Sequence, residues 1–388
     1  MLYTLPKPTR ILPSFASSLK AALAQQRLSH DQIVSLVQTT NRTEIDALHN
    51  AADSVTRKVF GDYVSIRGII EFSNICEKRC DYCGVPTYDQ KFLINQDVIL
   101  RCCDFMYAEG YRNVVLQSGE VSTNERINWV LELVHKIKSK FGFEQDKGMC
   151  IVLSIGELSR QQYQKLFDAG ANRYLLRIES SDPQLYSSMH PKTNHSFQRR
   201  LQALHDLKDI GYVTGTGVMV GVPNQTYDNL AQDIEFFRDE GYHMIGLGPY
   251  LVHNDTIMGK RILNTTTREE RKEADLLKAD ITLNMYDTIR LLCPYVNIAA
   301  TTALETLSPG YKKRALTGGA NVLMPIITPK EFRDGYQIYE GKKEVNMDHI
   351  ETHQMMLELM NAINKKPMFT KWNNPPLYTM RNNPATSH

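Results

Sequence analysis

Three cysteines on one short stretch limit what this chain can fold into more than any other feature of its sequence. Cys76, Cys80 and Cys83 stand at C-x3-C-x2-C spacing, directly after the apolar residues 66–72. That apolar run has the β-branched and aromatic composition of a strand, so we expect the cysteines on a loop that leaves its carboxyl end. Thiolates ligate zinc, iron–sulfur clusters or copper, and the stretch therefore predicts a metal site.

The number of thiols in this loop helps to choose between the metals. A structural zinc site needs four protein ligands, yet no second C-x-x-C exists and no histidine lies between His49 and His135. Conventional iron–sulfur proteins also use four cysteines, so three would leave one iron open to a further ligand. We therefore favour an iron–sulfur cluster with one open iron. Zinc with a distant fourth ligand and a chance group of inert cysteines are the alternatives.

The remaining composition bounds the class of protein. Seven cysteines, an odd number, do not suit a secreted disulfide framework, and the other four are expected to be buried apolar side chains. The net charge of +2, with both signs interspersed, argues against a nucleic-acid partner or a membrane-surface patch. No apolar run reaches the ~18 residues that cross a bilayer. We expect a soluble protein of an intracellular, reducing compartment.

The amino-terminal stretch is basic and has no acidic residue before Asp31. Lys7, Arg10, Lys20 and Arg27 supply the charge, with serines among them. Organelle transit peptides have this composition, and an ordinary basic leading helix is the alternative. The predicted location is accordingly the cytoplasm, or a hydrogenosome- or mitochondrion-like organelle if the stretch is a targeting segment.

Strand and helix patterns alternate through the middle of the chain. Strand-like runs cover residues 64–72, 113–117, 149–154, 174–178, 213–220, 244–247, 296–300 and 321–324. Amphipathic stretches cover residues 96–109, 125–140, 160–169, 196–210, 227–240, 268–292 and 309–317. This alternation predicts an α/β fold, a (β/α)8 TIM-type barrel over residues 62–345, with an open doubly wound sheet as the alternative. In either fold, ligands bind at the carboxyl ends of the strands.

The two ends of the chain flank this barrel. Residues 1–61 are expected to form an amino-terminal extension and helices, with capping signals at Ser29 and Thr43. Residues 346–388 are expected to form a final helix over 346–364 and then an extended tail rich in proline and asparagine.

The cysteine loop resembles that of the radical S-adenosylmethionine (SAM) superfamily, in which C-x3-C-x-(aromatic)-C is followed by glycine. Tyr82 is the aromatic residue here, and Gly84 follows the last cysteine. The resemblance implies that Cys76, Cys80 and Cys83 are the catalytic ligands of one 4Fe–4S cluster. It also implies that SAM chelates the fourth iron and is cleaved reductively to a 5′-deoxyadenosyl radical.

The same resemblance implies which residues bind SAM at the strand ends. Ser118-Gly119-Glu120 resembles the superfamily's Gly-Gly-Glu motif, with serine in place of the first glycine, and would meet the SAM ammonium. Arg177 and Glu179 share one face because strand side chains alternate, and a structural ion pair is the alternative for them. Arg200 is the candidate for the SAM carboxylate. The implied cofactor contacts are Tyr82, Ser118, Gly119, Glu120, Ser154, Arg177, Glu179 and Arg200.

Longer collinear stretches are similar to FeFe-hydrogenase maturases of the HydE type. These are residues 66–74, 115–120, 153–157, 172–179, 219–223, 299–303 and 319–325. The resemblance implies a role in anaerobic metabolism, namely assembly of the di-iron subcluster of the H-cluster. It implies a small organometallic or amino-acid-derived substrate, and other maturases and a reducing electron donor as partners. The alternatives are a methylornithine-synthase-like or biotin-synthase-like enzyme, or a non-catalytic iron–sulfur scaffold.

The substrate would then lie in a cavity lower in the barrel. The implied lining residues are Arg173, Met219, Thr301, Thr302 and Met324. A cationic arginine suits an anionic substrate, while core filling by the methionines and a satisfied strand end at the threonines are the alternatives. Many HydE-type proteins carry a second cysteine motif near the carboxyl end, whereas no cysteine follows Cys293 here. We therefore expect a single cluster.

Overall fold

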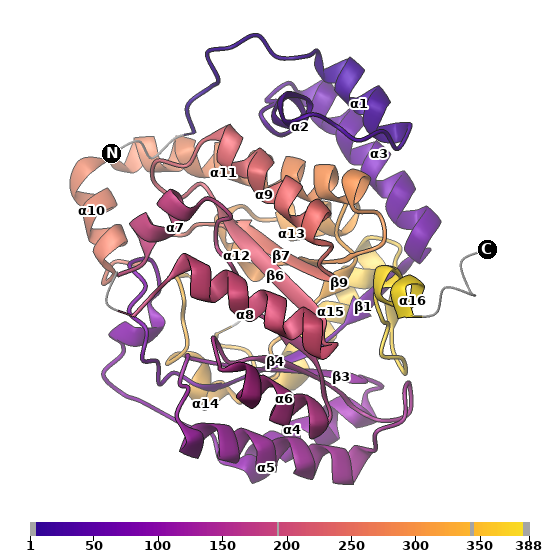
Figure 1. Cartoon of the computed structure of the whole chain (residues 1–388), viewed down its shortest axis with the longest axis vertical. Helices are drawn as coiled ribbons and strands as arrows, with labels where there is room; N and C mark the ends of the chain where they lie inside the picture. Colours follow the sequence, from indigo (N-terminus) through magenta and orange to yellow (C-terminus); the bar gives the residue numbers. More distant parts are fainter. Residues whose placement is uncertain (1–4, 192–193, 342–344, 383–388) are drawn as a thin grey trace.

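The computed structural model describes residues 5–191, 194–341 and 345–382, and its centre is a ring of parallel strands surrounded by helices (Figure 1). The strands are β1 (Tyr63–Ile66), β2 (Gly68–Ser73), β3 (Asn113–Ser118), β4 (Cys150–Ser154), β5 (Ala171–Leu175), β6 (Val213–Val220), β7 (Met244–Pro249), β8 (Asn297–Ala300), β9 (Val322–Leu323) and β10 (Lys366–Met368). Each strand from β2 to β8 pairs in parallel with its successor.

The first strand closes the ring. β1 and β2 are separated by Arg67 alone, so they continue one another, with β2 pairing β3 and β1 pairing β9. Further along, Ile69 N donates to Pro325 O at 2.9 Å and Ile327 N donates to Ile69 O at 2.8 Å. The first strand is therefore hydrogen-bonded on both sides. The predicted (β/α)8 barrel is confirmed, and the open-sheet alternative is excluded.

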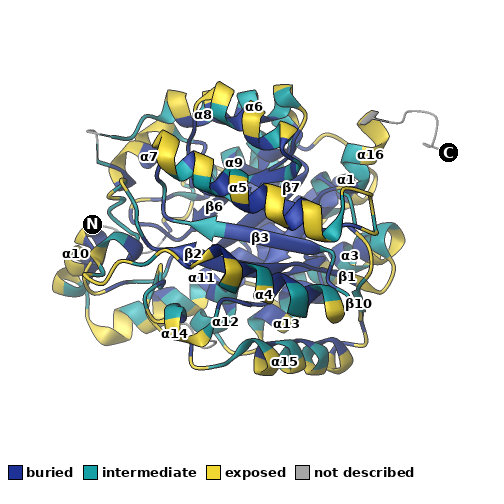
Figure 2. Ribbon diagram, turned by 90° about the horizontal axis from the view of Figure 1, so that it is seen from below, coloured by how far each residue is buried: buried dark blue, intermediate teal, exposed yellow. Residues whose placement is uncertain are grey.

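Helices cover the outside of the ring, with their buried faces toward the strands (Figure 2). Those predicted from the sequence are α4 (Gln96–Ala108), α5 (Asn124–Phe141), α6 (Arg160–Asp168), α8 (Phe197–Ile210), α9 (Tyr227–Glu240), α11 (Arg268–Leu292) and α13 (Tyr311–Leu316). Most begin at a serine, threonine or asparagine whose side chain accepts from the first turn, as Thr123 does for α5 and Ser159 for α6. The sequence did not predict the short helices η1 (Val85–Thr87), α7 (Pro183–Met189), α10 (Ile257–Thr265), α12 (Thr302–Leu307) and α14 (Lys330–Arg333).

Three helices precede the barrel, as expected: α1 (Phe15–Leu23), α2 (His30–Val37) and α3 (Arg42–Phe60). They pack on α9 and α11, and Ser29 forms the predicted capping box of α2. Two of the basic residues in this region make ion pairs with α9, Arg10 to Asp228 and Arg27 to Asp239. No helix in the part of the chain that the structure describes is long and apolar enough to cross a membrane.

The carboxyl-terminal tail differs from the prediction. After α15 (His349–Ala362), the tail is not simply extended, because it contains β10, which pairs with β1, and the short helix α16 (Pro376–Asn382). Between them the tail crosses the amino-terminal end of the barrel. Asn113 and Asn297, the first residues of β3 and β8, donate side-chain hydrogen bonds to the carbonyls of Lys371 and Asn373. One end of the barrel is thus closed, which leaves the carboxyl end for the site.

Replacing Trp372 should test this closure. Its side chain is 7% exposed, and its indole Nε1 donates to Gly148 O at 2.7 Å. We expect Trp372→Ala to lower the free energy of unfolding by about 3–5 kcal/mol, because a large buried side chain is removed. Urea denaturation followed by circular dichroism measures this. Phe143→Ala, at a side chain that is 60% exposed, should change it far less. If the two variants unfolded at the same urea concentration, the contact of Trp372 would not stabilise the barrel.

Candidate functional site

The loop after β2 brings its three cysteines to the carboxyl end of the barrel. Cys76, Cys80 and Cys83 all line one cavity of about 360 Å³, and all are free thiols. Three other segments fix the loop through its backbone. The amides of Glu77, Asp81 and Gly84 donate to the carbonyls of Glu120, Met189 and Ile338. The loop is therefore held in place by the protein alone.

The end of β3 sets the position of the first cysteine. Gly119 packs so closely on the loop that a Cβ there would lie 2.3 Å from Ile75 O and 2.7 Å from Cys76 Cβ. Beside it, Glu120 N donates to Cys76 Sγ at 3.3 Å. Only glycine allows this approach, which explains its place between Ser118 and Glu120.

The chemistry of the loop fits an iron–sulfur cluster. Burial raises the pKa of all three thiols, that of Cys80 to about 12, because thiolates lose solvation there. Bound iron would offset this cost, since the metal ligand is the thiolate. Within the described ranges, no fourth cysteine lines the cavity, and Cys102, Cys103, Cys150 and Cys293 are buried elsewhere, as predicted. Three sulfur donors suit a cluster with one open iron.

A buried network of charges lies beside the cysteines. Arg200, whose side chain is 8% exposed, reaches Glu120 Oε2 at 3.2 Å through Nη2 and Glu157 Oε2 at 3.3 Å through Nε. Lys78 Nζ lies 3.4 Å from Glu120 Oε1. Burial would lower the pKa of Arg200, but Glu120 and other neighbours raise it well above its ordinary value, so the guanidinium stays charged. Sequence reasoning did not single out Lys78 or Glu157, although both lie within motifs that it used.

This network is incompletely satisfied. Among the described residues, the buried atoms Glu120 Oε1, Glu157 Oε2 and Arg200 Nε have ion-pair neighbours but no hydrogen-bond partner. Buried charges normally complete their hydrogen bonds, so these atoms favour a ligand that carries both an ammonium and a carboxylate. An amino acid end group, such as that of SAM, has this chemistry.

Arg177 and Glu179 form an ion pair that is also part of the cavity lining. Arg177 donates to Glu179 from Nε at 2.9 Å and from Nη2 at 2.8 Å, and it also reaches the carbonyls of Val218 and Gly246. This contact agrees with the alternative given for these two residues in the sequence analysis, a structural ion pair. The predicted strand end at residue 178 is wrong, because β5 ends at Leu175 and Glu179 has a φ of +64°. Arg177 thus fixes the Glu179 carboxylate toward the cavity.

The structure brings most of the predicted cofactor contacts together. The cavity is lined by Tyr82, Ser118, Glu120, Ser154, Arg177, Glu179 and Arg200. Gly119 lies behind the cysteine loop instead, where its close backbone contact positions Cys76.

Of the residues predicted for the lower cavity, Met219, Thr301, Thr302 and Met324 line it. Thr302 Oγ1 shares a hydrogen bond with Tyr339 OH at 2.7 Å. In the described structure, the buried Thr301 Oγ1 has no hydrogen-bond partner. Thr302 therefore fits the alternative interpretation, in which a hydroxyl at a strand end is hydrogen-bonded within the protein. Thr301 does not fit it, and its hydroxyl is available to a ligand.

The prediction that Arg173 lines the cavity is wrong. Arg173 and Leu175 face the same side of β5, and Leu175 does line the cavity. Arg173 lies two residues nearer the amino end, where the tail closes the barrel. Its Nη2 donates to Trp372 O at 2.6 Å and to Asn374 Oδ1 at 2.9 Å. The guanidinium therefore anchors the tail.

Arg67 occupies the position that Arg173 was expected to take. It is 4% exposed and lines the cavity, and its Nη1 contacts Met244 Sδ at 3.0 Å. Its buried Nε and Nη2 find no hydrogen-bond partner in residues 5–191, 194–341 and 345–382. Burial, and secondly the charge of Arg173, lower its pKa to about 9. The sequence signal that could have found it is a lone arginine inside a strand of buried apolar residues.

Comparison with known proteins places these features in context. The family model of the Radical SAM superfamily matches residues 70–237. The chain is 35% identical over 348 residues to the [FeFe] hydrogenase maturase subunit HydE of Thermotoga maritima, covering 89% of this chain and 93% of that one. It is 23% identical over 321 residues to 3-methylornithine synthase of Methanosarcina acetivorans, covering 82% of this chain and 85% of that one.

Solved structures share the fold. Methylornithine synthase (PylB) superposes with a TM-score of 0.76 at 20% identity, covering 91% of this chain and 98% of the other. HydG, a maturase of the [FeFe]-hydrogenase, gives a TM-score of 0.71 at 16% identity and covers 91% and 75%. At these identities the likeness is evidence for the barrel only.

The contact at Gly119 predicts a defect in metal binding. We expect Gly119→Ala to lose most of the iron that the wild-type chain binds on anaerobic reconstitution, because the added methyl must displace Ile75 and Cys76. Gly246→Ala is the matched control, since its Cβ would lie 3.7 Å from Arg177 Nη1, an ordinary contact. Colorimetric iron analysis of the folded variants measures the difference. Wild-type iron content in Gly119→Ala would contradict the proposed constraint.

Proposed function

The chain belongs to the radical SAM superfamily and, within it, to the [FeFe]-hydrogenase maturases of the HydE type, and we propose how its cavity divides the work of such an enzyme. As a member of this family it cleaves SAM in hydrogenase maturation, and it acts with other hydrogenase maturases. The observation that carries the proposal is one cavity shared by three thiols, a buried charge network and Arg67, two of whose donors are unsatisfied among the described residues.

Cys76, Cys80 and Cys83 would hold one 4Fe–4S cluster. When bound, the cluster supplies the electron that cleaves SAM to methionine and a 5′-deoxyadenosyl radical. The three cysteines are half-buried, and the backbone hydrogen bonds of their loop hold them before any metal binds. The described part of the chain has no second group of three cysteines, so a single cluster is proposed. A reducing electron donor is needed as a partner, because each cleavage consumes an electron.

The charge network would bind the amino acid end of SAM. Glu120 would accept hydrogen bonds from the ammonium, and Arg200 would donate to the carboxylate. Both have buried atoms that lack a hydrogen-bond partner among the described residues, which supports this assignment. Ser154 and Glu179 would meet the ribose hydroxyls, with Glu179 held in place by Arg177. Tyr82 and Ser118 complete the wall around the cofactor.

The substrate would lie in the lower cavity, beneath SAM. A small anionic organometallic compound, such as a cysteine-bound iron carbonyl cyanide complex, suits the residues there. Arg67 supplies a buried cation and Thr301 a buried hydroxyl, each with an unsatisfied donor in the described structure, while Met219 and Met324 are apolar walls. The whole cavity, including the part beside the thiols, has a volume of about 360 Å³, which lies within the usual range for small-molecule sites. The enclosure would keep the radical away from solvent.

The cluster assignment is tested by two cysteine variants. We expect Cys80→Ala to leave an incomplete cluster and to form no 5′-deoxyadenosine, whereas Cys293→Ala, at a buried cysteine outside the cavity, should keep both. Iron analysis and chromatography of the SAM products measure these outcomes. Loss of iron in Cys293→Ala together with an intact Cys80→Ala enzyme would refute the ligand set.

The substrate assignment is tested at Arg67. We expect Arg67→Met to keep uncoupled SAM cleavage but to weaken substrate binding by about 1.5–3 kcal/mol, roughly 10- to 150-fold, because a charge-assisted contact is lost. The measurement is hydrogenase activity after in vitro maturation, across substrate concentrations. Arg67→Lys keeps the positive charge and should recover part of the loss. Full maturation by Arg67→Met would exclude the proposed role, and its retained SAM cleavage shows that the variant is folded.

A further inference from the structure

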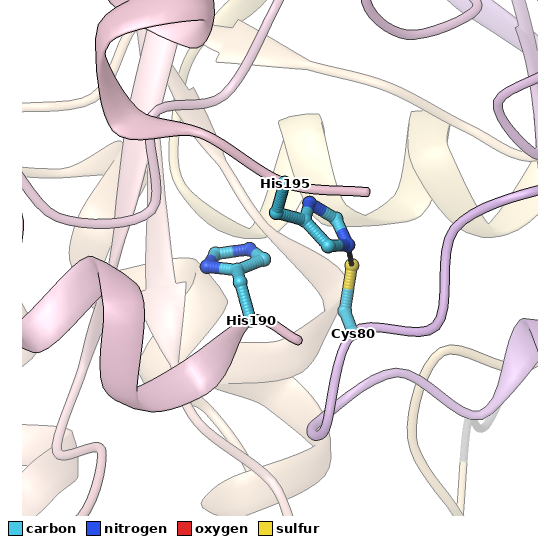
Figure 3. A group of neighbouring side chains, drawn as sticks. All are labelled: Cys80, His190 and His195. Atoms are coloured by element: carbon cyan, nitrogen blue, oxygen red, sulfur yellow. Dashed lines mark hydrogen bonds between the residues drawn. The ribbon is translucent and has the colours of Figure 1, made fainter. Parts of the chain in front are cut away.

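Cys80 faces two histidines that the cofactor and substrate contacts leave without a role. Figure 3 shows His195 pointing its ring at Cys80, with Nε2 lying 3.6 Å from Sγ, which is hydrogen-bonding distance for sulfur. His190 lies beside it, and one ligand atom from each of the three residues falls within 4.8 Å of the others. Such a group could be a separate metal site or a hydrogen-bonded support for the cysteine.

The contacts of His190 decide between these two possibilities. Its Nδ1 lies 2.7 Å from Tyr186 O, and because a carbonyl only accepts, Nδ1 must be the donor. In the neutral ring Nε2 is then the acceptor, and Tyr82 OH lies 3.4 Å from it. With both nitrogens engaged, His190 is poorly placed to ligate a metal. Its ring instead stacks on Tyr186, with centroids 4.0 Å apart, and is rigidly held.

His190 in turn holds His195. The two imidazoles lie with their centroids 4.6 Å apart, which leaves Nε2 of His195 directed at the sulfur. His195 also directly precedes Ser196, the N-cap of α8, and α8 carries Arg200. The segment that contacts the cluster ligand is therefore the one that presents the proposed partner of the SAM carboxylate.

We propose that His195 is a positioning residue that donates a hydrogen bond from Nε2 to the Cys80 sulfur and thereby raises the reduction potential of the cluster. The inference rests on the proposed function, because it requires Cys80 to be a cluster ligand. Reduction adds negative charge that is shared by the cluster's sulfurs, and a hydrogen-bond donor at a ligand sulfur stabilises that charge. His195 therefore makes the electron easier to accept, and its own role involves no bond to iron.

The test is an EPR-monitored redox titration of the reconstituted chain without SAM. We expect His195→Ala to bind wild-type iron and to have a more negative reduction potential than the wild type. His195→Gln keeps a side-chain N–H donor and should recover most of the shift. The matched control is His205→Ala, since His205 also lies on the α8 segment but pairs with Glu240 at 3.2 Å, away from the cysteines. Its potential should equal that of the wild type.

Three results would overturn the inference. They are an unchanged potential in a fully loaded His195→Ala chain, an equal shift in His195→Gln, and loss of iron in both His195 variants, which would make the residue a ligand or a purely structural group. A wild-type chain that binds no cluster is a different outcome, because it removes the proposed function itself. The two failures are thus distinguished by the iron content of the wild type.

Discussion

Hydrogen bonding on both sides of the first strand holds the rest of this structure together. β1 pairs with β9, and β2 pairs with β3. The backbone of Ile69 is also hydrogen-bonded to those of Pro325 and Ile327, so the ring closes on the strand that carries the cysteine loop. The same strand pairs with β10 of the tail at its amino end. Because one strand serves closure, tail and loop, the positions of the thiols are coupled to the integrity of the whole barrel. A rigid frame of this kind can hold metal ligands in place before the metal binds.

Within the closed barrel, the buried charges are separated by depth. Near the thiols, Arg200 is balanced by Glu120 and Glu157. Deeper in the cavity, Arg67 has unsatisfied donors among the described residues, and burying a cation in this way costs free energy. The tail, fixed by Trp372 and Arg173, closes the end beneath. The charges of both signs near the thiols suit a zwitterionic cofactor. The cation of Arg67, deeper in the cavity, suits an anionic substrate. Closure of the barrel beneath them by the tail suits radical chemistry, because it limits access of solvent.

The sequence predicted the features that local residue patterns determine. It did not predict how deep in the barrel a given side chain lies. The strands were found from runs of β-branched residues, and the cysteine loop from its spacing, because both signals lie within a few residues of chain. Arg173 was misplaced since alternation along a strand tells which face a side chain takes, not which layer of the barrel it reaches. Arg67 and His195 were missed because their importance comes from partners they lack or meet only in the fold. The tail's strand and helix depend on contacts with the barrel.

The most direct test of these assignments is the product of SAM under reducing conditions. Anaerobically reconstituted chain would be mixed with SAM and dithionite, and 5′-deoxyadenosine and methionine would be quantified by chromatography. We expect both products in equal amounts, because one electron delivered through the three-cysteine loop releases one of each. A chain with a filled cluster that forms neither product would contradict the catalytic assignment and leave the loop as a site that only stores or carries iron.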